Sequence, residues 1–132
     1  GAAPSAGKAV VPGDFAGRYR LFANGQWSGV LELEVGDRDA IRGVFRSDQT
    51  GNAYKVTGQA AFEEPNRAVF AADLPRSRLE FDGRLWTEGK GALAGTITLL
   101  DRSFGFFAVR EGGRFAPEGV ETRLEDGAAG DP

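Results

Sequence analysis

The stretch Ile41-Arg42-Gly43-Val44-Phe45 places a glycine midway between two apolar residues, and the same pattern recurs along the chain. In a β-strand, residues two apart point to one face of the sheet, so the glycine shares a face with both apolar side chains. Glycine weakens a strand unless the backbone bends sharply there or another group approaches closely. The repeated pattern therefore predicts a small, tightly coiled β-barrel. Its other copies centre on Gly17, Gly29, Gly58, Gly83 and Gly95, with a degenerate copy around Gly105.

Strand and turn signals continue from residue 15 to residue 110. Asn24-Gly25 is the strongest two-residue hairpin signal, and Gly36-Asp37 and Asp101-Arg102 indicate further turns. Eight short sequential strands without a helical period predict an all-β domain in which an up-and-down antiparallel meander closes into a barrel. A sandwich or a half-open roll is the alternative. The expected strands cover residues 15–23, 26–35, 39–47, 53–62, 67–74, 78–86, 91–100 and 103–110.

The chain of 132 residues is long enough for one domain with a single core. Residues 1–13 are small and include proline, which is typical of a linker or of the segment that follows a signal peptide. Residues 14–111 form the expected barrel domain. Residues 112–132 lack an apolar period, and we expect both ends of the chain to be disordered. The composition of residues 1–13 favours a bacterial protein exported to the periplasm or beyond.

Composition excludes several classes of function. The chain contains no histidine and no cysteine, which removes the commonest general base and the commonest metal ligands. The net charge is −3 and the basic residues are scattered, so nucleic acid is a poor candidate partner. No apolar run is long enough to span a bilayer. We therefore expect no enzyme, no catalytic residue, no metal site and no cofactor.

The inward residues of such a barrel divide between its two ends, because neighbouring strands run in opposite directions. The end with the Asn24-Gly25 turn and the loop 48–52 receives aromatic side chains together with polar tips. These residues either line a pocket for a small apolar or aromatic ligand or plug the barrel end, and the sequence leaves both interpretations open. The candidate ligand-binding residues are Tyr19, Trp27, Phe45, Ser47, Tyr54 and Phe81.

Two neighbouring strands and their loop resemble part of a known family. The stretch 41–47, IRGVFRS, then Gly51-Asn52-Ala53, then 54–58, YKVTG, resembles the third strand, mobile loop and fourth strand of streptavidin-like proteins. Gly17-Arg18-Tyr19 looks like the Gly-x-Trp opening that avidins share with lipocalins. The resemblance over the first four strands implies an eight-stranded calycin-type barrel with a ligand site.

By that resemblance, Ser47 would hydrogen-bond the ligand and Phe45 would replace a hydroxyl-bearing tyrosine. The chain departs from the family at Phe81, which stands in place of a ligand-stacking tryptophan. The family's buried aspartate near the last strand has no counterpart. We therefore expect biotin binding to be absent or weak.

A second set of aromatic residues is expected on the outer face of the barrel. Several lie on the first, second and last strands, which become neighbours when the barrel closes. A contiguous exposed apolar patch marks an interface, either with a second copy of the chain or with a neighbouring domain, unless a tail covers it. The candidate interface residues are Phe22, Trp86, Phe104 and Phe106.

Two functions remain open. The first is a non-enzymatic barrel that binds a small molecule at the end with the loop 48–52. The second is a structural or protein-interaction domain with a filled core that acts through its outer apolar face, including a protease inhibitor of barrel type.

Overall fold

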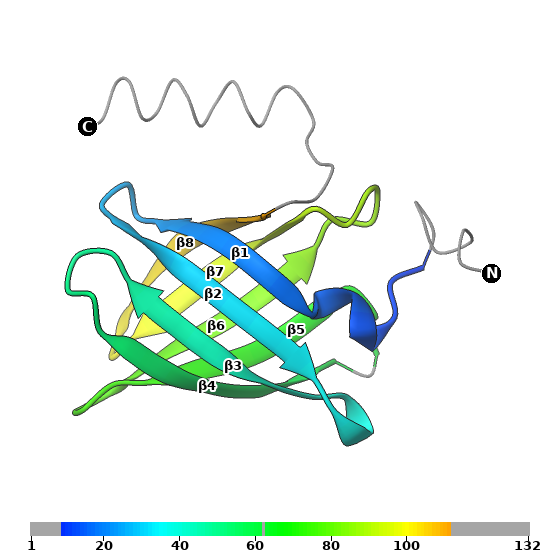
Figure 1. Cartoon of the computed structure of the whole chain (residues 1–132), viewed down its shortest axis with the longest axis horizontal. Coiled ribbons are helices and arrows are strands. Elements are labelled where there is room, and N and C mark those ends of the chain that lie inside the picture. Colours follow the sequence, from blue (N-terminus) through cyan, green and yellow to red (C-terminus); the bar gives the residue numbers. More distant parts are fainter. Residues whose placement is uncertain (1–8, 62, 112–132) are drawn as a thin grey trace.

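The computed structural model describes residues 9–61 and 63–111, and eight antiparallel strands in chain order close into a barrel, as the sequence predicts (Figure 1). The strand bounds agree closely with those expected, except that residues 12–15 form a short 3-10 helix. The elements are η1 (Pro12–Phe15), β1 (Gly17–Ala23), β2 (Trp27–Val35), η2 (Asp37–Asp39), β3 (Ala40–Ser47), β4 (Ala53–Ala60), β5 (Arg67–Asp73), β6 (Arg78–Leu85), β7 (Ala92–Leu99) and β8 (Arg102–Arg110).

Closure joins the first strand to the last. Every strand pairs with its neighbours in sequence, and β1 also pairs with β8. Tyr19 consequently lies opposite Leu31 of β2 on one side and opposite Arg110 of β8 on the other. A closed barrel has no exposed sheet edge, so its backbone hydrogen bonds are satisfied around the whole circumference.

The glycines of the repeated pattern permit close contact between neighbouring strands. A Cβ atom added at Gly43 would collide with the backbone carbonyl oxygen of Glu32, and one added at Gly95 would collide with that of Asp82. In both cases the obstacle is backbone, which cannot rotate away as a side chain can. Gly29 and Gly58 are blocked by neighbouring backbone in the same way, so at four positions of the pattern the tightly coiled sheet leaves no room for a side chain. At Gly17 and Gly83 the nearest atoms belong to side chains instead.

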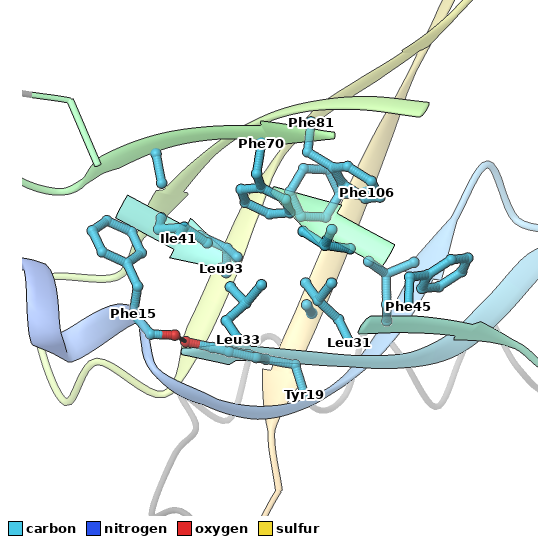
Figure 2. Packing of buried hydrophobic residues seen from close by; sticks show 14 of the residues in the cluster. Phe15, Tyr19, Leu31, Leu33, Ile41, Phe45, Phe70, Phe81, Leu93 and Phe106 are labelled. Atoms are coloured by element: carbon cyan, nitrogen blue, oxygen red, sulfur yellow. Dashed lines mark hydrogen bonds between the residues drawn. The ribbon is translucent and has the colours of Figure 1, made fainter. Parts of the chain in front are cut away.

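Phenylalanine rings fill the middle of the barrel. The rings of Phe70 and Phe81 are stacked with centroids 4.9 Å apart, and Phe106 meets Phe81 edge to face at 5.4 Å. Phe45 approaches Phe81 at 6.4 Å. Figure 2 shows this cluster, with Phe15 lying toward one end of the barrel. Such contacts between buried aromatic rings stabilise the fold beyond the burial of their area.

The expected orientation of β8 was wrong. Phe106 is buried in the core, and Phe104 packs against it from the same face, whereas Phe107 points outward. The cause is the two-residue turn at Leu100 and Asp101, which places Leu99 opposite Arg102 and therefore pairs odd-numbered residues of β7 with even-numbered residues of β8. Gly105 is exposed, and a Cβ atom added there would meet only the Gly95 carbonyl oxygen, at an ordinary contact distance of 3.7 Å, so the degenerate copy of the pattern does not belong to the inward set.

Part of the expected linker belongs to the barrel. Val10 is buried in the core, and η1 begins at Pro12, inside the stretch 1–13. Val11 donates its backbone N–H to the Asp14 carboxylate, 2.8 Å away, at the start of the helix, and the helix ends at Ala16, which is extended and leads directly into β1. Residues 1–8 and the predicted tail, 112–132, lie outside the described residues.

Candidate functional site

One end of the barrel is sealed by η1. Phe15 is completely buried there, and its carbonyl oxygen accepts a hydrogen bond from the Tyr19 hydroxyl at 2.8 Å. The Arg110 guanidinium donates to the carbonyl oxygens of Ala16 at 2.6 Å, of Asp14 at 2.7 Å and of Lys90 at 3.1 Å. One arginine therefore fastens η1 and the turn between β6 and β7 to the last strand, and we call this the closed end.

A nearly buried ion pair completes the closed end. The Lys90 ammonium lies 2.9 Å from the Asp14 carboxylate and donates a second hydrogen bond to the Ala9 carbonyl at 3.0 Å. Partial burial raises the pKa of Asp14, but the hydrogen bond from Val11 and the Lys90 charge outweigh it and hold this pKa below its usual value. Burial also raises the pKa of Tyr19 to about 12. The polar side chains of Asp14, Tyr19, Lys90 and Arg110 thus bond to other groups of the protein at this end.

The opposite end has no such cover among the described residues, and we call it the open end. It carries the turns between β1 and β2, β3 and β4, β5 and β6, and β7 and β8. A ring of apolar side chains packs on the core from this side while staying partly exposed. Leu100, at the tip of the last of these turns, is 78% exposed. The members of this open-end ring are Trp27, Tyr54, Leu74, Leu99 and Phe104.

Two of these aromatic residues contact each other directly. Trp27, at the start of β2, and Phe104, near the start of β8, meet edge to face with ring centroids 5.1 Å apart. The contact crosses β1, because β2 and β8 both pair with that strand. An aromatic pair held in fixed geometry and only half-buried offers a rigid apolar surface on which a flat group can pack.

Two hydroxyl groups lie at the same end. The Ser47 Oγ atom accepts a hydrogen bond from the backbone N–H of Thr50 at 3.4 Å, and the Tyr54 hydroxyl accepts one from the Asn52 side-chain amide at 3.3 Å. Both hydroxyl hydrogens have no acceptor among the described residues. These two groups can therefore donate to an acceptor atom on a bound molecule.

The loop between β3 and β4 is held firmly over this end. Asp48 accepts hydrogen bonds from Arg20 at 2.5 Å and from the Ser28 hydroxyl at 2.7 Å, while Gly51 donates to the Ser47 carbonyl at 2.7 Å. The resemblance to streptavidin-like proteins implies a mobile loop at this position. Here the loop is tied to β1 and β2 through Asp48.

The structure brings only half of the candidate ligand-binding residues together. Trp27, Ser47 and Tyr54 all lie at the open end, as expected. Tyr19 was assigned to this end wrongly: it is completely buried at the closed end, with its hydroxyl bound to η1. Phe45 and Phe81 are buried within the core. A single pocket lined by all six residues is therefore not formed, because the middle of the barrel is packed with rings.

The candidate interface residues also separate. Phe22 and Trp86 lie on the outer side, whereas Phe104 and Phe106 are part of the interior and were assigned outward wrongly. The outer neighbour that the sequence interpretation missed is Phe107, which lies opposite Phe22 in the register and meets Trp86 edge to face at 5.3 Å. A turn placed at Leu100 and Asp101, one residue earlier than expected, would have predicted that Phe107 points outward.

A separate open groove of about 300 Å³ lies on the outer face of β2, β3 and β4. Acidic and basic side chains face it in equal number, so it carries no net charge. The lining residues are Glu32, Glu34, Arg42, Gly43, Val44, Lys55 and Val56.

Within residues 9–61 and 63–111, no group of three or more acidic side chains, histidines or cysteines is placed to hold a metal ion. In the same residues, no helix is long and apolar enough to cross a membrane.

Comparison with known proteins adds no relative: no protein-family model matches the chain, and neither a curated protein nor a solved structure does. The site is therefore assigned from the geometry of this chain alone.

Proposed function

We propose that this barrel is a non-enzymatic binding domain that holds a small apolar or aromatic ligand across its open end. The observation that carries the proposal is the contrast between the two ends. The closed end is sealed by η1, whereas the open end leaves the apolar ring of Trp27, Tyr54, Leu74, Leu99 and Phe104 partly exposed. Partly exposed aromatic side chains grouped around polar atoms are typical of ligand sites.

The filled core defines how such a ligand would bind. Phe45, Phe81 and Phe106 occupy the interior, so the ligand rests on the ring and does not enter the barrel. Trp27 and Phe104 supply a flat apolar surface, and the hydroxyl groups of Ser47 and Tyr54 supply hydrogen bonds. This arrangement keeps the role that the streptavidin-like resemblance implies for Ser47 and moves the stacking role to Trp27.

A neutral fluorescent probe tests the proposal. We expect N-phenyl-1-naphthylamine, whose emission rises in apolar surroundings, to bind the protein saturably. Trp27→Ala should weaken this binding about tenfold or more, the loss expected on removal of one aromatic anchor. Phe22→Ala is the matched control, because Phe22 is a partly exposed aromatic residue on the outer face. Equal losses in both variants, or no saturable binding, would overturn the proposal.

The outer face supports a second candidate function, association with a second copy of the chain. Phe22 is 38% exposed and lies opposite Phe107 across the seam between β1 and β8. Val109, also on the outer side of β8, extends this apolar surface. Export of the domain remains a prediction from the composition of residues 1–13.

A further inference from the structure

A charged residue shares the inward register with the open-end ring. Arg102 begins β8 and lies directly opposite Leu99, two residues before Phe104. Residues opposite each other in an antiparallel pair point to the same face, as do residues two apart in one strand. Arg102 therefore projects on the same side of the sheet as two members of the ring, where the strand emerges from the barrel.

No carboxylate in the described part of the chain neutralises Arg102. At this end Arg20 pairs with Asp48 and Arg78 pairs with Asp73. These two carboxylates therefore already have arginine partners other than Arg102. Asp101, the neighbour of Arg102 in the turn, makes no ion pair with it in the described residues. The Arg102 guanidinium consequently lies at the edge of the ring without a carboxylate partner among the described residues, although the chain as a whole carries a net charge of −3.

From this juxtaposition we propose that the ligand of the open end is an amphipathic anion, with an apolar or aromatic body lying on the ring and an acidic group bound by Arg102. The inference rests on the proposed function. A guanidinium offers a planar fork of donors that matches a carboxylate, sulfonate or phosphate group. The acidic group is thus recognised by its charge and its oxygen atoms, while the ring selects the apolar body.

The strength of this contact follows from its exposure. Arg102 is exposed, so water competes for both charges and the attraction is moderate. It selects between an acid and its neutral counterpart by a few fold, whereas the apolar body supplies most of the affinity. The attraction must also weaken with salt, since exposed charges are screened over about 10 Å at 0.1 M ionic strength.

Two probes with the same aromatic body isolate the charge. N-phenyl-1-naphthylamine is neutral, and 8-anilinonaphthalene-1-sulfonate is the same molecule bearing a sulfonate. We expect the intact protein to bind the sulfonate about threefold to fivefold more tightly at low salt, the range of one exposed charge contact. Arg102→Gln should abolish this preference and leave the affinity for the neutral probe unchanged. Arg102→Lys, which keeps the charge, should restore part of it.

Arg42→Gln is the matched control, because Arg42 is an exposed arginine on the outer face, outside the ring. The proposal is overturned if the sulfonate preference survives in Arg102→Gln, or if Arg42→Gln lowers it equally. It is also overturned if 0.5 M salt leaves the preference intact. Saturable binding of the neutral probe without any sulfonate preference would refute the anion site alone, whereas failure of the neutral probe to bind would refute the proposed function.

Discussion

The guanidinium of Arg110, on the last strand, lies over the ring of Tyr19, on the first, with its Cζ atom 4.9 Å from the ring centroid. The two residues are also direct partners across the seam where β1 meets β8. Because the same guanidinium donates hydrogen bonds to three backbone carbonyl groups, it joins the seam, η1 and the turn before β7 in one contact. Arg110 therefore contributes both to the closure of the barrel and to the sealing of its end.

Replacement of Arg110 by lysine should destabilise the protein by roughly 2–4 kcal/mol, because an ammonium group cannot reach all three carbonyl groups and leaves some of them buried without a donor. Urea unfolding followed by circular dichroism measures this change. Arg42→Lys, at an exposed position, should stay within about 0.5 kcal/mol of the parent protein. Equal stability of the two variants would show that Arg110 does not hold the closed end.

Acid should weaken the closed end through Asp14. Its pKa in the folded protein is below the ordinary value of 3.8, so its contribution to stability is complete above that value and disappears as the pH falls through the folded-state pKa. Asp14→Asn should cost about 2 kcal/mol at pH 7, because it also leaves Lys90 buried without its carboxylate. The difference from the parent protein should shrink steadily below about pH 4. Urea midpoints at several pH values test this, and a difference independent of pH would contradict it.

The glycine pattern can be tested with the smallest side chain. Gly95→Ala should destabilise the protein by more than about 2 kcal/mol, because the added methyl group meets the backbone of β6 and strands must move apart. Gly43→Ala should behave alike against β2. Gly105→Ala is the control within the same barrel, since a Cβ atom there would lie 3.7 Å from its nearest neighbour, an ordinary van der Waals distance. Similar unfolding midpoints for all three variants would refute close strand approach as the reason for the pattern.

Self-association through the outer face gives a separate prediction. Phe22→Ser combined with Phe107→Ser should leave the circular dichroism spectrum unchanged, because both side chains lie outside the core. If the outer face joins two copies, light scattering should find dimers of the parent protein at high concentration and monomers of the double variant. A parent protein that stays monomeric at every concentration would remove this second function.

Biotin should bind weakly or not at all. Recognition of its ureido ring requires polar partners inside a barrel. Among the described residues, Lys90 is the one buried residue that is polar or charged, and its ammonium group is bound to Asp14 at the closed end. Each unmatched polar group of a bound ligand costs about 1–3 kcal/mol. Calorimetry should therefore give no heat at micromolar concentrations. A dissociation constant below micromolar would show that the core opens to admit the ligand.

The barrel was predictable because its signals are local and repeated. Asn24-Gly25 indicates a hairpin by itself, and the alternation around Gly43 and Gly95 indicates the buried face of each strand without knowledge of its partners. The expected order of eight strands follows directly from these signals, and the structure confirms it.

The candidate site was harder to predict from the sequence, because it depends on where each strand begins relative to its neighbours. Tyr19 and Trp27 are both inward aromatic residues, but they lie near the starts of two antiparallel strands and therefore at opposite ends. Because η1 takes up residues 12–15 and has no periodic signal in the sequence, β1 begins only at Gly17, which leaves Tyr19 close to the closed end. Phe104 and Phe106 change face when the turn moves by one residue. Arg102 carries no motif at all, and it becomes notable only once Leu99 is placed opposite it.

The seam also determines how the domain can be attached to other structures. The chain enters the barrel through η1 and leaves it after Arg110, and the hydrogen bonds between them show that entry and exit are neighbours. Whatever is joined to either side of the barrel is therefore attached at one pole, and the ring of Trp27 and Phe104 faces the other. An attachment made directly at η1 and Arg110 would therefore lie at the closed end, on the far side of the barrel from the proposed binding surface.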